Sequence, residues 1–144
     1  MALKVTKTDV WAAEIRDQPG GLAKVMGKIA STRANLECVI ARRQPDKPGT
    51  GVVFISPLTG KKALAAAAKV GFHETWRIAT VKVEGGDRPG LGAKIAQAVG
   101  AADISMRGLS AATVGRRFVA YLGFDSWEDA IKAAAAIKAM DRKR

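Results

Sequence analysis

The sequence predicts an α+β protein in which one small module occurs twice. The tetrapeptide Asp-Gln-Pro-Gly at 17–20 returns as Asp-Arg-Pro-Gly at 87–90, an offset of 70 positions. Each copy follows a segment with the two-residue alternation of a strand and precedes an apolar stripe with helical spacing. The chain of 144 residues has room for two small modules. We therefore expect one module at 1–72 and another at 73–144.

The first module is expected to contain three strands and two helices. The strands are predicted at 10–16, 36–44 and 51–58, and the helices at 22–29 and 61–70. Pro19 stands just before the first helix, where its missing N–H does no harm. Thr59 is placed to cap the second helix, and Gly71 is placed to end it. A further short strand is expected between Phe72 and Arg77, continuing into the strand that begins at Ile78.

The second module repeats this order. Its strands are predicted at 78–84, 104–113 and 116–125, and its helices at 91–101 and 130–140. The dipeptide Val114-Gly115 is predicted to turn a hairpin between the second and third of these strands. Ser126 and Asp129 resemble a capping box before the last helix. Because that helix runs almost to residue 144, we expect the second module to lack a fourth strand of its own.

The order β-α-β-β-α, found twice, predicts two tandem ferredoxin-like βαββαβ modules. In this arrangement an antiparallel sheet carries its helices on one face. The other face and the unpaired sheet edges are expected to be semi-apolar. Such surfaces are natural places for the two halves, or for two chains, to join. We therefore expect a homodimer.

The turns and their surroundings resemble those of ACT domains. The resemblance is carried by the segments 17–22 and 87–91, and by Ala-Asn-Leu-Glu at 34–37 and Ala-Asp-Ile-Ser at 102–105, which open the second strands. It covers nearly the whole chain. The resemblance implies a stand-alone, tandem ACT-domain protein that binds an amino acid between paired modules and regulates without catalysing a reaction. Its partner would then be an unidentified metabolic enzyme or regulator.

The resemblance also implies which residues meet the ligand. They are Asp17, Gln18, Pro19, Gly20, Gly21, Leu22, Asn35, Leu36, Asp87, Arg88, Pro89, Gly90, Leu91, Ile104, Ser105 and Arg107. Glycines let a ligand approach the backbone, and the unpaired N–H groups of a helix N-terminus attract a carboxylate. Asn35 can both donate and accept hydrogen bonds, which suits a zwitterion and makes the first module the better-equipped site. Asp17 and Asp87 either accept from a ligand ammonium group or cap their helices.

Catalysis, cofactors and metals find little support in the sequence. His73 is the single histidine, and no cluster has the spacing of metal ligands. The single cysteine, Cys38, lies in an apolar run and cannot form an internal disulfide. No apolar run reaches about 18 residues, so we expect no membrane span and a cytoplasmic protein.

RNA binding is the main alternative function, because the same element order builds RRM domains and the net charge is +11. An RRM needs aromatic residues on the exposed face of both central strands. Phe118 and Tyr121 are three positions apart on one strand, so they should point to opposite faces. This spacing favours a small-molecule ligand over RNA. A purely structural adaptor role is the third possibility.

Overall fold

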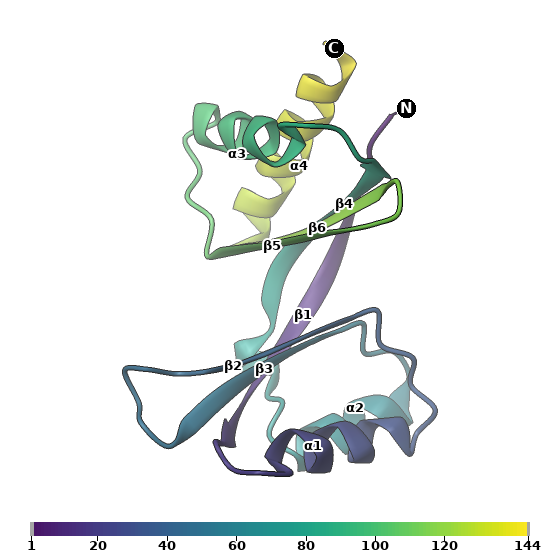
Figure 1. Ribbon diagram of the computed structural model, residues 1–144, viewed down its shortest axis with the longest axis vertical. Helices are drawn as coiled ribbons and strands as arrows, with labels where there is room; N and C mark the ends of the chain where they lie inside the picture. The colour runs from purple at the N-terminus through teal and green to yellow at the C-terminus, as the bar shows by residue number, and fades with distance from the viewer. Residues whose placement is uncertain (1, 144) are drawn as a thin grey trace. The chain divides into compact units, whose positions relative to one another are not determined.

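The computed structural model describes residues 2–143, apart from the side chain of Thr75 (Figure 1). Its elements are β1 (Lys4–Arg16), α1 (Gly21–Ala30), β2 (Cys38–Arg43), β3 (Thr50–Ser56), α2 (Lys61–Lys69), η1 (Glu74–Trp76), β4 (Ile78–Gly86), α3 (Leu91–Ala101), β5 (Gly108–Val114), β6 (Arg117–Phe124) and α4 (Trp127–Arg142). The predicted α+β class is therefore confirmed. The chain forms two compact units. The first unit is Asp9–Arg77, and the second joins the segment that ends at Thr8 to the chain from Ile78 on.

The first unit has the strand order β2-β3-β1, with antiparallel pairing. Ala13 lies opposite Val53, and both are completely buried. Alternate residues of β1 and β3 meet α1 and α2 in one core, because side chains two apart on a strand share a face. The helices contribute Val25, Ile29, Ala63 and Ala67. Small alanines let α2 lie close to the sheet.

The second unit has the strand order β1-β4-β6-β5, and again the pairs β4–β6 and β5–β6 are antiparallel. Val81 lies opposite Leu122, and both are fully buried. The helices α3 and α4 pack against these strands in one core. They contribute the buried side chains of Leu91, Ile95, Val99, Ala130, Ala133, Ala134 and Ile137. Both helices therefore cover the face of the sheet on which Val81 and Leu122 lie.

The beginning of β1 supplies a strand that the sequence did not assign to the second module. Leu3 and Val5 pack against the core of the second unit. Leu3 also lies so close to Gly85, near the end of β4, that its Cδ2 would be 2.7 Å from a Cβ at that position. Since β1 is 13 residues long, its first residues belong to one unit and the remainder to the other. The units therefore divide the chain differently from the expected boundary between 72 and 73.

Several local expectations can be compared with the backbone. The short strand expected after Phe72 is wrong, because Glu74–Trp76 forms a 3-10 turn. Thr59 does not cap α2. Gly60, with a φ of 86°, holds the N-cap position, and no side chain caps that helix. Gly71, with a φ of 103°, does follow the end of α2 as expected.

The cap predicted for the last helix is confirmed, although the helix begins at Trp127, three residues before the predicted start at Ala130. The Asp129 N–H donates a hydrogen bond of 3.1 Å to Ser126 Oγ. Ser126 has the extended backbone of an N-cap, and α4 begins at the next residue.

Candidate functional site

Each unit carries a glycine in the left-handed conformation where a turn enters a helix. Gly20 precedes α1 with a φ of 80°, and Gly90 precedes α3 with a φ of 78°. Only glycine adopts this conformation without strain. No side chain caps either helix, and neither helix has an acidic residue in its first turn. The Gly21 and Leu91 N–H groups donate to the Gln18 and Arg88 carbonyls at 3.1 and 3.3 Å, so it is the following N–H groups of each first turn that can attract an anion.

The space in front of these helix ends is open. A Cβ built on Gly20, Gly90 or Gly92 would meet no atom within 4 Å. Gly21 differs, since its Cβ would lie 2.7 Å from the Arg16 carbonyl oxygen. Gly21 is thus required by the packing of the turn itself, whereas the other glycines leave room for a ligand.

The aspartates of the two turns are held by their backbones in the same way. The Asp17 N–H donates to the Gly49 carbonyl at 3.0 Å, and the Asp87 N–H donates to the Arg116 carbonyl at 2.8 Å. Each acceptor lies in the hairpin loop of the same unit. The Asp17 carboxylate is 2.8 Å from Arg43 Nε. Of the two roles left open for these aspartates, helix capping is excluded, because α1 and α3 have no side-chain cap.

The entry to the second strand of each unit also repeats. Arg33 and Asp103 have φ values of 65° and 61°, an uncommon conformation for residues other than glycine. Four positions further on, the Glu37 and Arg107 N–H groups donate to the neighbouring strand at 2.8 and 2.7 Å. Both pairs have the offset of 70 found in the turns. The segments 34–37 and 102–105, which the resemblance to ACT domains pairs with each other, differ by 68 positions. They therefore do not correspond residue by residue, and the correct offset is 70.

With this correction, Asn35 corresponds to Ser105 and Glu37 to Arg107. All four side chains are exposed. Arg107 lies 3.9 Å from Asp125. Sequence reasoning missed Glu37, and the offset of 70 from Arg107 is the signal that finds it. The first unit therefore presents an amide and a carboxylate where the second presents a hydroxyl and a guanidinium.

Several predicted ligand residues have side chains that are used elsewhere. Leu91 and Ile104 lie in the core of the second unit, and Leu36 packs against the core of the first. These residues can offer only backbone groups to a ligand. Arg88 Nη2 is 3.9 Å from Asp141 Oδ1, and the Arg88 side chain is 24% exposed. Its guanidinium therefore contacts the last turn of α4.

The remaining turn residues lie at the surface. Gln18, Pro19 and Pro89 are exposed, and so is Leu22 in the first turn of α1. Leu22 stands 70 positions before Gly92. The Leu22 side chain therefore occupies part of the space in front of α1, whereas Gly92 leaves the same position in front of α3 empty.

Residues with catalytic or metal-binding chemistry do not gather in the described part of the chain. Among residues 2–143, no group of three His, Cys, Asp or Glu side chains is arranged to hold a metal ion. His73 is exposed, and its ring packs edge-on with the Trp76 ring, with the two ring centroids 5.9 Å apart. In the same described range, no helix has both the length and the apolar character to span a bilayer.

One carboxylate has a shifted pKa. Lys47 Nζ donates to Glu14 Oε1 at 2.9 Å, and Gln44 Nε2 donates to Glu14 Oε2 at 3.3 Å. These hydrogen bonds, with that from Lys47 the larger cause, lower the pKa of Glu14 below its ordinary value. The cluster joins β1 to the β2–β3 loop and does not include a predicted ligand residue.

The aromatic residues are arranged unlike those of an RRM. Phe118 is buried among the helices, so it lies on the opposite face from Tyr121 as expected. On β4 the residue opposite Tyr121 is Lys82, whose Nζ lies 5.8 Å from the ring centroid. The neighbouring central strand thus carries a lysine where base stacking would need a second aromatic residue.

Solved structures share this fold. Protein BT0572 from Bacteroides thetaiotaomicron matches with a TM-score of 0.74 and 12% identity, over 93% of this chain and 97% of that chain. The ligand-free regulatory subunit of aspartate kinase from Thermus thermophilus has a TM-score of 0.66 and 21% identity, over 97% of both chains. Aspartate kinase from Clostridium acetobutylicum has a TM-score of 0.62 and 14% identity, over 96% of this chain and 34% of that chain.

The sequence itself matches no protein-family model and no curated protein. At the identities of the structural matches, the likeness is one of fold. With the regulatory subunit of aspartate kinase among its structural neighbours, the chain has an ACT-like fold.

Proposed function

We propose that this chain is a small-molecule-binding regulatory protein whose ligand is an amino acid. The observation that carries the proposal is the pair of uncapped helix ends behind Gly20 and Gly90, each facing open space. An α-carboxylate placed there would accept hydrogen bonds from first-turn N–H groups and lie at the positive end of the helix dipole.

The polar residues at the second strands extend this site toward the rest of the ligand. In the first unit, Asn35 and Glu37 suit an ammonium group. In the second, Ser105 and Arg107 suit a second carboxylate or another acceptor. The first unit is therefore the better match to a zwitterion, which agrees with the role that the sequence suggests for Asn35.

We further propose that the ligand lies at an interface with a second copy of the chain. Val39 on β2 and Leu109 on β5 are 70 positions apart, and each is 41% exposed on an edge strand. Edge strands with exposed apolar side chains favour pairing with another chain. A homodimer formed along these edges would cover both residues.

The regulatory output of the protein would pass to another molecule. We propose that the chain itself catalyses no reaction. The structural neighbours include a regulatory subunit of aspartate kinase and a complete aspartate kinase, which supports a metabolic enzyme as the partner. The cytoplasm, where such enzymes act on free amino acids, is the proposed compartment.

A thermal-shift screen with the twenty amino acids tests the proposal. A ligand at a hundred times its Kd should stabilise the folded state by about 2.7 kcal/mol. The decarboxylated amine of an active amino acid should have no effect, because it lacks the group that the helix ends would bind. If no amino acid shifts the melting temperature and single-stranded RNA binds with a strong salt dependence, RNA binding replaces this proposal.

A further inference from the structure

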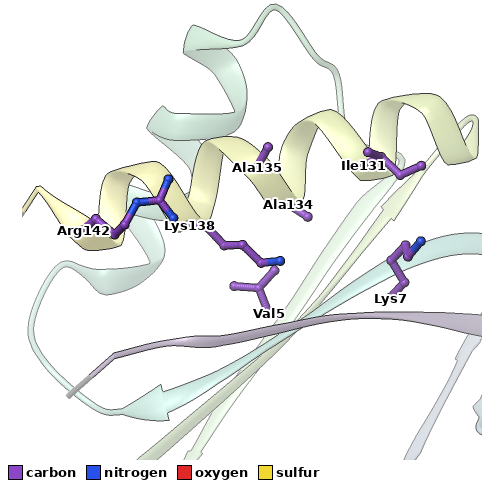
Figure 2. A pocket seen from close by; sticks show the side chains of 7 residues that line it. All are labelled: Val5, Lys7, Ile131, Ala134, Ala135, Lys138 and Arg142. Atoms are coloured by element: carbon purple, nitrogen blue, oxygen red, sulfur yellow. The ribbon is translucent and has the colours of Figure 1, made fainter.

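The second unit contains a pocket that includes none of the residues of the candidate site. Figure 2 shows it between the beginning of β1 and α4. Its volume is about 420 Å³, and its lining residues are Val5, Lys7, Ile131, Ala134, Ala135, Lys138 and Arg142. A volume of this size falls within the range of pockets that bind small organic molecules. None of the predicted ligand residues contributes to it.

The α4 side of the pocket is one continuous stripe of the helix. Ile131, Ala135, Lys138 and Arg142 follow one another at spacings of four, three and four, which place them on a single face. Small alanine side chains in the middle of this stripe leave the hollow, and longer side chains stand at both ends. The helix therefore forms one wall, and β1 forms the other.

Part of the pocket surface is apolar. Ile131 is 53% exposed, although isoleucine is among the residues most often buried in proteins. Val5 packs partly against the core and presents the rest of its side chain to the pocket. An apolar body placed between these two side chains would remove their surface from water, which is favourable.

The polar part of the pocket is cationic. Lys7, Lys138 and Arg142 line it, and none of its seven residues is acidic. Of the ion pairs among residues 2–143, none involves these three side chains. The carboxylate nearest in sequence, that of Asp141, accepts from the Leu3 N–H and faces Arg88. The lining thus carries three positive charges, spread along the pocket, and no counter-charge, so that it attracts an anion.

We propose that this pocket binds a small organic anion, a carboxylate or phosphate that carries an aliphatic or aryl body. Lys138 and Arg142, four positions apart on α4, would hold the anionic group, and Val5 and Ile131 would cover the apolar body. Lys7, which Figure 2 shows at the Ile131 end of the pocket, would add to the positive potential. The site is separate from the helix ends proposed to bind an amino acid, so each proposal can fail without the other.

Fluorescence titration of the full-length protein with 8-anilino-1-naphthalenesulfonate tests this site. The probe combines an aryl body with one anionic group and should bind with a salt-sensitive affinity. Octanoate and octyl phosphate should both displace it, and whichever does so at the lower concentration identifies the preferred anion. If octylammonium displaces it equally well, or if inorganic phosphate does, the proposed combination of charge and apolar body is wrong.

Substitutions on α4 provide matched controls. Lys138→Gln should weaken probe binding about tenfold, the loss expected for one charged hydrogen-bond donor. Lys132→Gln removes the same charge from the same helix, but Lys132 lies outside the pocket and pairs with Glu128 at 3.2 Å. That control should stay within twofold of the wild type. Equal losses in the two variants would mean that only the overall charge of the protein matters, and would overturn the proposal.

Two further variants guard against a loss of fold. Arg142→Gln should also weaken binding about tenfold, and its exposed position predicts an unchanged melting temperature. Ile131→Gln should weaken the binding of octanoate more than the binding of inorganic phosphate, because it removes an apolar contact and no charge. Unchanged affinity in both variants would contradict the assignment of this pocket.

Discussion

The Asp141 carboxylate accepts a hydrogen bond of 2.7 Å from the Leu3 N–H, which links residues 138 positions apart in the sequence. This contact ties the last turn of α4 to the beginning of β1, and Figure 1 shows both chain ends at the same end of the second unit. The same carboxylate faces Arg88, whose Nε and Nη2 atoms are buried without a hydrogen-bond partner among the described residues. Asp141 thus provides an acceptor for the Leu3 N–H and a negative charge for the Arg88 guanidinium, where little water reaches either group.

Asp141→Ala should destabilise the protein by about 1–3 kcal/mol, because it leaves the partly buried Leu3 N–H without its acceptor and the Arg88 guanidinium without its counter-charge. Chemical denaturation measures the loss. Asp125→Ala serves as the control, since the Asp125 side chain is 71% exposed and lies 3.9 Å from Arg107. That variant should change the free energy of unfolding by no more than about 0.5 kcal/mol. Similar losses in both variants would argue against a structural role for the Leu3–Asp141 contact.

Gly21→Ala should destabilise the first unit by about 1–3 kcal/mol, because its Cβ would press against the Arg16 carbonyl oxygen at 2.7 Å. Gly27→Ala lies in the same helix, and its Cβ meets nothing within 4 Å. This control should stabilise by about 0.5–1 kcal/mol, since alanine is the better helix former. Thermal unfolding of the two variants gives the comparison. Opposite signs support the packing role of Gly21, and a stabilised Gly21→Ala protein would refute it.

Leu22→Glu and Gly92→Glu should weaken the binding of an amino-acid ligand about tenfold or more. A carboxylate in the first turn competes with the ligand's carboxylate for the same N–H groups and repels it. The same charge stabilises a helix N-terminus, so the melting temperature should not fall. Leu22→Gln and Gly92→Gln match the size without the charge. Calorimetric titration separates the pairs. If the glutamine variants lose as much affinity as the glutamate variants, the ligand does not bind through the positive charge of the helix ends.

The lowered pKa of Glu14 predicts a pH dependence of stability. A carboxyl whose folded-state pKa is depressed stabilises the protein above its unfolded-state pKa, and this contribution disappears as the pH falls through the folded-state pKa. Wild type should therefore be more stable than Glu14→Gln at neutral pH. The difference should vanish in acid, below the ordinary pKa range of a glutamate. Melting temperatures of both proteins between pH 7 and strong acid provide the check, and a difference that persists in acid would contradict the ionic origin.

Val39→Lys combined with Leu109→Lys should weaken self-association, because charged side chains on edge strands oppose pairing with another chain. Sedimentation equilibrium measures the change. Leu64→Lys is a suitable control that should leave self-association unchanged, since Leu64 is 39% exposed but lies on α2 and not on an edge strand. A wild-type protein that stays monomeric at all concentrations would exclude the proposed dimer.

The local elements were largely predictable from the sequence. The predicted bounds of α3 and the predicted start of α2 at Lys61 agree with the structure. The cap at Ser126 was also predicted, although α4 begins three residues before the expected start at Ala130. The turns at 17–20 and 87–90, which the motif places just before a helix, also lie there in the structure. These features depend on residues close together in the chain, such as apolar spacing, a cap or a glycine in a turn.

The candidate site was only partly predictable. The motif locates the turns, but the left-handed backbone at Arg33 and Asp103 has no signature in residue type. It shifts the register of the following segment by two, and so brings Glu37 into correspondence with Arg107. Nothing in the sequence indicated that the Arg88 side chain would be directed to α4, because its partner Asp141 lies more than fifty positions away.

The sequence by itself therefore determined the class of the protein, the repeated turn and the order of its helices and strands. Only the tertiary structure decided that the beginning of β1 completes the second unit, and that Lys7 and Lys138 line one pocket. The physical reason is the range of the interactions. Periodicity and capping act within a few residues, whereas the partner of an edge strand is chosen by the apolar surface and hydrogen bonds that distant segments bring to it.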